Sequence, residues 1–154
     1  MKNNIGLFVD VGNLFFCTSK HFKGSKGLVN YAKYLAYVQE TYGTTFQTFA
    51  YCTRFGNDGA DGFDVVLRRM GYQTKNRMAN EKGRVAWNVE IACDVAKVID
   101  RLDAVILGSA DNGLAPVAEY VKSLGLPCYA VACCVGRELK NAVTRYDEVT
   151  VDIF

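Results

Sequence analysis

The sequence lacks residues that several common catalytic and metal sites require. It contains a single histidine, His21, and no two cysteines separated by two residues. One histidine cannot complete a usual zinc ligand set, and a lone, distant histidine argues against nucleophilic catalysis by Ser109. The phosphate-binding pattern Gly-x-x-x-x-Gly-Lys is also absent. The sequence therefore argues against zinc sites, serine hydrolases and P-loop nucleotide hydrolases.

The chain also lacks a long apolar run and a strong excess of one charge. Half of its 154 residues are apolar, 22% are charged and the net charge is +2, as in ordinary soluble globular proteins. No stretch of about 18 apolar residues occurs, so we expect no membrane-spanning segment and no membrane partner. A chain of this length can bury a substantial core, and we expect a single domain over residues 1–154.

The six cysteines do not predict disulfide bonds. No secretory signal precedes them, because the first residues already show the pattern of a core strand. Four of the six lie in apolar runs, where cysteine behaves as a small hydrophobic residue. We therefore expect reduced thiols and a cytoplasmic location.

Strand and helix patterns alternate along the chain. Residues 44–53 alternate and are rich in Thr, Phe and Tyr, which is typical of a strand, whereas apolar residues recur at helical spacing within residues 28–42. The same criteria predict strands at 4–10, 72–77, 103–108, 126–134 and 148–153, helices at 63–70, 86–101, 113–124 and 137–145, a loop around 20–26 and a turn at 57–59. This order predicts an α/β fold, with a mainly parallel central sheet in a three-layer α/β/α arrangement.

Two of the predicted strands lead into an aspartate. An apolar run ends at Asp10, and a second run ends at small residues followed by Asp111. The carboxyl ends of parallel strands open into the crevice where such sheets bind ligands. Converging carboxylates repel one another unless a cation lies between them, and oxygen ligands suit Mg²⁺ or Mn²⁺. Two alternatives stay open, because Asp10 could form a turn or helix cap and Asp111 could be a helix N-cap.

Glu90 and Asp94 lie four residues apart on the predicted helix at 86–101, so they share one face. Their neighbours are mostly apolar, and a carboxylate in such surroundings needs a partner. We expect Asp94 to point into a polar site, while Glu90 could equally be an exposed helix residue.

Polar and basic residues near these acids suggest further roles. Asn13 could orient Asp10 or a metal-bound water, although asparagine is also common in turns. Ser109 could cap a helix or contact a phosphate. A basic cluster follows the second predicted strand and comprises Arg68, Arg69, Lys75, Arg77, Lys82 and Arg84. It is either a solvated helix face or a rim that contacts phosphates.

Three motifs, in order, resemble those of the NYN domain, a PIN-like, LabA-like ribonuclease family. The first is Phe8 to Asn13, the second is Lys82-Gly83 followed by Trp87 to Asp94, and the third is Ser109 to Pro116. The segment 137–142 is similar to the closing helix of the family. The resemblance covers essentially the whole chain and implies a PIN-like, Rossmann-like fold.

The resemblance also implies a metal-dependent nuclease that acts on RNA. Asp10, Asn13, Asp94 and Asp111 match family positions. Asn88 and Gly113, however, stand where the family has aspartate, and losing these carboxylates should weaken the binding of a divalent cation. Glu90, on the same helix as Asn88, is a candidate replacement.

The leading hypothesis is a ribonuclease that uses Mg²⁺ or Mn²⁺. Asp10, Asp94 and Asp111, with Glu90, would hold the metal that activates water, and Asn13 would complete the catalytic set. The expected RNA contacts come from Ser109, Asn88, Lys82, Arg84 and Arg77. A binding module that has lost catalysis, for nucleic acid or protein, is the alternative, and a receiver-like domain that binds Mg²⁺ or a small ligand is a third. A homodimer or a protein partner is also possible.

Overall fold

A six-stranded parallel sheet forms the centre of the structure, a computed structural model that describes residues 2–22, 29–56, 60–83 and 85–149. Its strand order is β3-β2-β1-β4-β5-β6, and all five pairings are parallel. The strands are β1 (Lys2–Asp10), β2 (Gly43–Arg54), β3 (Gln73–Met78), β4 (Ala104–Gly108), β5 (Cys128–Ala132) and β6 (Arg145–Glu148).

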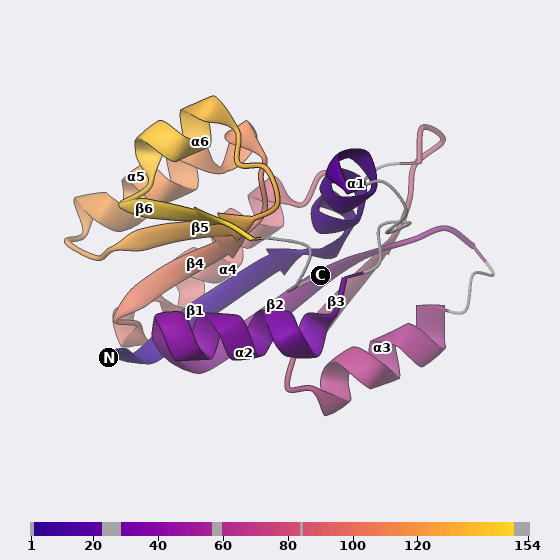
Figure 1. The fold of residues 1–154 in the computed structure, drawn as a ribbon, viewed down its shortest axis with the longest axis horizontal. Coiled ribbons are helices and arrows are strands. Elements are labelled where there is room, and N and C mark those ends of the chain that lie inside the picture. Colours follow the sequence, from indigo (N-terminus) through magenta and orange to yellow (C-terminus); the bar gives the residue numbers. More distant parts are fainter. Residues whose placement is uncertain (1, 23–28, 57–59, 84, 150–154) are drawn as a thin grey trace.

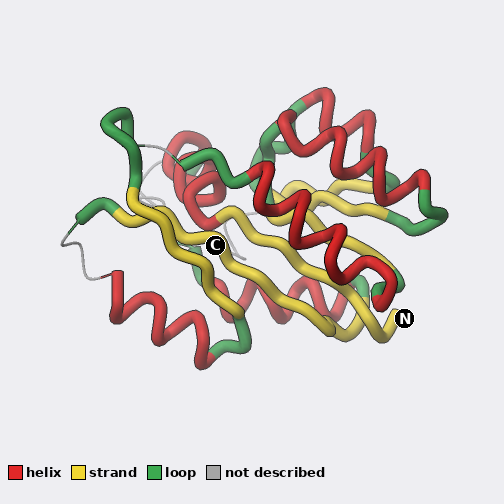
Figure 2. Tube along the Cα trace, turned by 180° about the vertical axis from the view of Figure 1, so that it is seen from behind, coloured by secondary structure: helices red, strands yellow, loops and turns green. Residues whose placement is uncertain are grey.

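Helices cover both faces of this sheet. They are α1 (Val11–His21), α2 (Tyr31–Thr41), α3 (Ala60–Arg69), α4 (Asn88–Val98), α5 (Ala115–Ser123) and α6 (Arg137–Ala142), with short 3-10 helices η1 (Ile99–Arg101) and η2 (Asn112–Leu114). Helix α2 crosses one face (Figure 1), and α4 crosses the other (Figure 2). The predicted three-layer α/β/α fold with a parallel central sheet is confirmed. Each described helix falls short of the length and hydropathy that a transmembrane segment needs.

The two central strands are buried on both faces. In β1 the residues from Ile5 to Asp10 are buried, as is every residue of β4. Such strands have continuous apolar runs instead of an alternating pattern. Asp10 and Asp111 follow these apolar runs, at the carboxyl ends of the two strands.

Helix α1 is not predicted from the sequence. It begins directly after β1 because Asp10 is its N-cap, with Oδ1 accepting a hydrogen bond from the backbone N–H of Asn13 at 3.0 Å. Leu14 and Thr18 are its buried residues, whereas Phe16 is exposed. The apolar residues of this segment therefore do not follow the stripe that identifies an amphipathic helix.

The C-terminal part differs from its prediction in two places. The helix expected at 137–145 ends at Ala142, and Arg145 already begins β6. The closing strand expected at 148–153 is therefore misplaced, since β6 pairs with β5 over Arg145–Glu148. Residues 150–153, the predicted turn at 57–59 and positions 23–26 of the predicted loop lie outside the described residues.

Candidate functional site

A cavity of about 340 Å³ opens at the carboxyl edge of the central strands. We call it the acidic pocket; its lining includes Asp10, Gly12, Asn13, Phe16, Thr53 and Asp111. Asp10 is the last residue of β1, and Asp111 follows the end of β4 by three residues. Strands β1 and β4 are hydrogen-bonded neighbours, with Val9 paired to Gly108, so their ends meet. This adjacency brings the two carboxylates to one cavity.

Asp10 is almost completely buried, at 8% exposure. Burial, with a smaller contribution from the nearby negative charge of Asp111, raises the pKa of its carboxyl to about 6. Hydrogen bonds from the backbone N–H groups of Asn13 and Gly12 oppose this shift. The ionised form of Asp10 is therefore destabilised near neutral pH, and a cation beside it would stabilise that form.

Asp111 is held by donors on both oxygens. Its Oδ1 accepts a hydrogen bond from the backbone N–H of Gly113 at 2.8 Å, which caps η2. Its Oδ2 accepts one from the Nδ2 of Asn88 at 3.0 Å. Asn88, the first residue of α4, thus lies beside the acidic pocket, at a position where the NYN motif carries an aspartate. The amide of Asn88 thus donates to Asp111 without adding negative charge to the site.

Asn13 connects α1 to the end of β4. Its side-chain Oδ1 accepts a hydrogen bond from the backbone N–H of Ala110 at 2.9 Å, while its own backbone N–H donates to the Oδ1 of Asp10, the N-cap of α1. This residue therefore ties the two acid-bearing segments together. Ser109, by contrast, is fully buried, and its Oγ accepts a hydrogen bond from the backbone N–H of Asp111 at 3.2 Å. The prediction that Ser109 contacts substrate is wrong in this arrangement, since the hydroxyl shapes the turn beneath Asp111.

Asp94 is not part of the acidic pocket. Its two oxygens lie 2.8 and 2.7 Å from the Nζ of Lys75, and Oδ2 also accepts a hydrogen bond from the hydroxyl of Tyr51 at 2.8 Å. Asp10, Tyr51 and Lys75 lie in register on β1, β2 and β3, so Lys75 is two strand spacings, roughly 10 Å, from Asp10. That Asp94 shares one metal site with Asp10 and Asp111 stays a prediction. In this structure Lys75 and Tyr51 hold Asp94 over β2 and β3, and Asp94 does not line the acidic pocket.

Glu90 is engaged in the same way. It forms an ion pair with Arg77, whose guanidinium also lies 5.6 Å from the centre of the Trp87 ring. Lys75 and Arg77 are two residues apart on β3 and point to one face, where they meet Asp94 and Glu90 of α4. The replacement of the missing carboxylate by Glu90 stays a prediction. In this structure Glu90 pairs with Arg77, and it is Asn88 that contacts Asp111.

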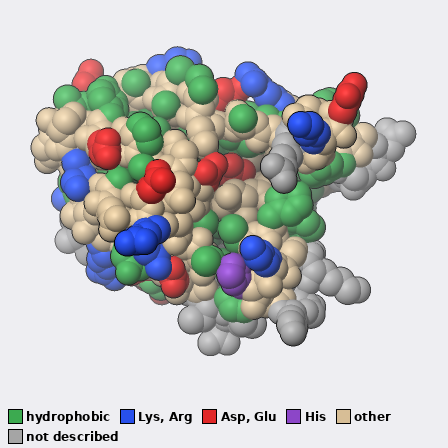
Figure 3. Space-filling view, turned by 90° about the horizontal axis from the view of Figure 1, so that it is seen from above, with side chains coloured by type: hydrophobic (Ala, Val, Ile, Leu, Met, Phe, Trp, Pro, Cys, Tyr) green, Lys and Arg blue, Asp and Glu red, His purple; other side chains and the backbone are tan. Residues whose placement is uncertain are grey.

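The predicted basic rim is largely neutralised. Besides Lys75 and Arg77, Arg68 is paired with a carboxylate, that of Asp64. Lys82 is exposed and precedes Gly83, which also lines the acidic pocket, whereas Arg84 lies outside the described residues. On the face shown in Figure 3, the described basic side chains are scattered among acidic and hydrophobic ones. Electrostatic attraction of a polyanion to this region is therefore modest.

Two residues of the pocket were not anticipated. Thr53 comes from the carboxyl end of β2, and its Oγ1 accepts a hydrogen bond from the indole N–H of Trp87 at 3.1 Å. Phe16 comes from α1, one turn after Gly12. Thr53 could have been found as a polar residue at the end of a predicted strand, whereas Phe16 required knowledge of α1.

The donor set fits a weakly held magnesium ion. Within the described residues no three side chains among His, Cys, Asp and Glu are grouped closely enough to hold a metal ion, so Asp10 and Asp111 are a pair. Mg²⁺ commonly keeps several water ligands and uses one or two carboxylates together with substrate phosphates. Asn88 adds a buried side-chain oxygen with no hydrogen-bond partner in the described part of the chain. Amide oxygens are also suitable ligands for such a cation.

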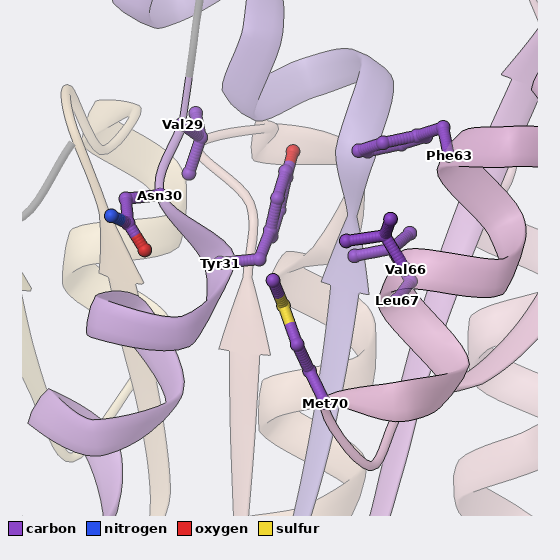
Figure 4. A pocket seen from close by; sticks show the side chains of 7 residues that line it. All are labelled: Val29, Asn30, Tyr31, Phe63, Val66, Leu67 and Met70. Carbon is purple, nitrogen blue, oxygen red and sulfur yellow. The ribbon is translucent and has the colours of Figure 1, made fainter. Parts of the chain in front are cut away.

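A second cavity, of about 360 Å³, lies between the start of α2 and α3. Figure 4 shows the rings of Tyr31 and Phe63 facing each other across it, with Leu67 and Met70 alongside. The side chains that line it carry neither a carboxylate nor a basic group, so it offers nothing for phosphate chemistry.

These features define the class of protein: a parallel α/β domain with paired aspartates at the carboxyl ends of adjacent central strands. The NYN domain family matches residues 4–149, nearly the whole chain, and the protein belongs to this family. The structure is similar to the crystal structure of VPA0982, a protein of unknown function from Vibrio parahaemolyticus RIMD 2210633, with a TM-score of 0.83 and 19% identity over 99% of this chain and 96% of that one. That likeness concerns the fold. No curated protein matches the sequence.

The raised pKa of Asp10 predicts a pH-dependent stability. In the metal-free protein, ionisation of Asp10 lowers the free energy of unfolding as pH rises from about 4 through about 6. Asp10→Asn cannot ionise, so its stability advantage over wild type should grow from near zero at pH 4 to about 2–3 kcal/mol at pH 7.5. Urea unfolding of both proteins in chelator measures this difference. An advantage that is equal at both pH values would show that Asp10 does not titrate in this range.

Proposed function

We propose that this protein is a metal-dependent ribonuclease that hydrolyses RNA phosphodiester bonds at the acidic pocket. The observation that carries the proposal is the convergence of Asp10 and Asp111 at the ends of adjacent strands, where the charge of one raises the pKa of the other. Asp10 is buried and Asp111 is half-buried, and none of the described residues that line the cavity is basic. Such a pair of carboxylates is a poor structural element but a suitable site for a divalent cation. Membership of the NYN family, whose domains are usually nucleases, agrees with this assignment.

Asp10 and Asp111 would hold the Mg²⁺ or Mn²⁺ ion. When bound, such an ion supplies a water of lowered pKa and neutralises the charge that develops on the phosphate. Ionised Asp10 is available above a pH of about 6, so cleavage should increase with pH through that value. Asn13 fixes the separation of the two acid-bearing segments through its bond to Ala110.

The ion pairs between β3 and α4 help to position the acidic pocket without lining it. Asp94 bonds to Lys75 and Tyr51 and thereby locks α4 onto the sheet. The first residue of the same helix, Asn88, bonds to Asp111. We assign Asp94 a positioning role, because its oxygens are occupied and it does not line the pocket.

The alternative is a domain that binds RNA without cleaving it. The contact of Asn88 with Asp111 favours it, because the amide occupies a place where a further carboxylate would strengthen metal binding. Gly113 stands at the other position where the family has an aspartate, so a second carboxylate is missing there. A side chain at position 113 would bring its Cβ within 2.4 Å of the Nδ2 of Asn88, so an acid at 113 requires Asn88 to move. Rebuilding the acid set of the family changes both positions, and the side chain at 88 has to rotate away from 113 whether it is asparagine or aspartate, because the two have the same shape.

Restoring both acids distinguishes the two functions. Wild type should cleave a labelled single-stranded RNA in Mn²⁺ and not in chelator, and N88D/G113D should cleave about tenfold faster at limiting metal, because added carboxylates tighten divalent sites. Gel analysis of the products over a metal titration measures both rates. If wild type binds RNA without cutting it and the double variant gains cleavage, the natural chain is a binding module. If neither protein cleaves, the nuclease proposal is overturned.

A further inference from the structure

Two large aromatic side chains stand exposed at the mouth of the acidic pocket. Phe16 lines the cavity and is 54% exposed, and Phe55, just after β2, is 51% exposed. Gly83 also lines the cavity, and the position its Cβ would take lies 3.8 Å from the ring of Phe55. The pocket therefore has an exposed phenyl ring on the α1 side and a second one beyond Gly83.

The position of Phe16 follows from α1. Gly12, Asn13 and Phe16 lie at i, i+1 and i+4, so they share a side of the helix, and all three line the pocket. Helix α1 stands just beyond the tip of β1 (Figure 1). The Phe16 ring also meets Phe15 edge to face, at 5.6 Å between ring centres. Its exposed surface is therefore held next to Asp10 and is not buried in the core.

Charge alone does not provide strong RNA binding here. The net charge is +2, and the basic side chains of Lys75 and Arg77 are paired with acids. Aromatic side chains offer the other common means of holding a single strand, because every base has a face that can stack on them. Stacking on one ring typically contributes about 5- to 150-fold in affinity.

We propose that Phe16 stacks on an unpaired base of single-stranded RNA whose backbone phosphate lies at Asp10 and Asp111. This inference rests on the proposed function and narrows its substrate class. In a duplex the bases are stacked on one another and are not available to a protein ring. The surface therefore selects single strands, loops or ends over double-stranded RNA.

Binding of fluorescent RNA to Phe16→Leu tests the inference, with Phe46→Leu as the matched control. Leucine keeps apolar volume but lacks the aromatic face. Phe46 is 46% exposed, near the start of β2, and lies under Arg101 instead of lining the acidic pocket. We expect Phe16→Leu to raise the Kd for a single strand by about 5- to 30-fold and Phe46→Leu to change it less than about twofold. Anisotropy in chelator and again in Mg²⁺ measures both, and thermal melting checks the fold.

An RNA strand that lacks bases, combined with Phe16→Leu, completes a double-mutant cycle. Removing the bases from the middle of the strand should weaken binding by wild type to the level of Phe16→Leu, and should weaken Phe16→Leu little further. Equal Kd values for the two leucine variants, full affinity for the abasic strand, or no binding of single strands by wild type in either buffer overturns the inference. Cleavage is scored separately. Phe16-dependent binding without cleavage defeats the nuclease proposal alone, and cleavage with unchanged Kd and KM in Phe16→Leu defeats the stacking proposal alone.

Discussion

Asp10→Asn is expected to lower metal-dependent cleavage of single-stranded RNA by roughly a thousandfold. The substitution removes one of the two carboxylates of the acidic pocket and leaves Asp111 as the remaining acid. Losing the electrostatic contribution of a bound divalent ion costs about 4 kcal/mol of transition-state stabilisation, which corresponds to that factor. The rate is measured from single-turnover cleavage in Mn²⁺. The stabilising shift in Tm that Mg²⁺ produces in wild type should disappear as well.

The fold should survive this substitution. An asparagine side chain retains an oxygen that can accept the hydrogen bond from Asn13, so the N-cap of α1 persists. Asp100→Asn is a suitable control, because Asp100 is an exposed acid in η1, at the opposite edge of the sheet from the pocket. Asp100→Asn should cleave at the wild-type rate. If Asp10→Asn cleaves as fast as Asp100→Asn, the acidic pocket is not the catalytic site.

Lys75→Met is expected to lower the free energy of unfolding by about 2–3 kcal/mol. The substitution leaves the carboxylate of Asp94, whose side chain is 6% exposed, without its closest cation. Breaking a buried ion pair typically costs about 3–5 kcal/mol, and the loss is smaller here because Lys75 is partly exposed and Tyr51 still donates to Asp94. Urea denaturation measures the change.

A second substitution separates the effect of the unpaired Asp94 carboxylate from the other effects of losing Lys75. K75M/D94N removes the unpaired carboxylate as well, so it should recover a large part of the loss seen in Lys75→Met. Lys97→Met is the control, because Lys97 is well exposed and lies 3.9 Å from Asp94, where a surface pair contributes little. A loss for Lys97→Met equal to that for Lys75→Met, or no recovery in the double variant, would contradict the role given to Lys75.

The two central strands could be predicted from the sequence because they are buried on both faces. The apolar runs before Asp10 and Asp111 are visible without any structure, and β1 and β4 correspond to them. Helix α1 could not be predicted in this way. It joins β1 without a turn, and its exposed Phe16 weakens the apolar periodicity that identifies a helix.

The site could be predicted only in part. The shared helix face of Glu90 and Asp94 follows from their spacing, but spacing does not tell which element packs against that face. The structure places β3 there, with Lys75 and Arg77 at matching positions. Each acid then forms an ion pair and is withdrawn from the pocket, because a nearby ammonium or guanidinium is the strongest partner available to a carboxylate in a poorly solvated place.

What the sequence by itself determined is the alternation of strands and helices, apart from α1 and the position of β6, and the presence of an aspartate after each of two buried runs, since both depend on local pattern. Only the tertiary structure decided that β1 and β4 are neighbours, and hence that Asp10 and Asp111 share a cavity. It also decided that Asp94 faces Lys75. The physical reason is that the environment of a carboxylate is set by groups within a few ångströms, and the hydrogen-bond partners of Asp94, Lys75 and Tyr51, are 19 and 43 residues away along the chain.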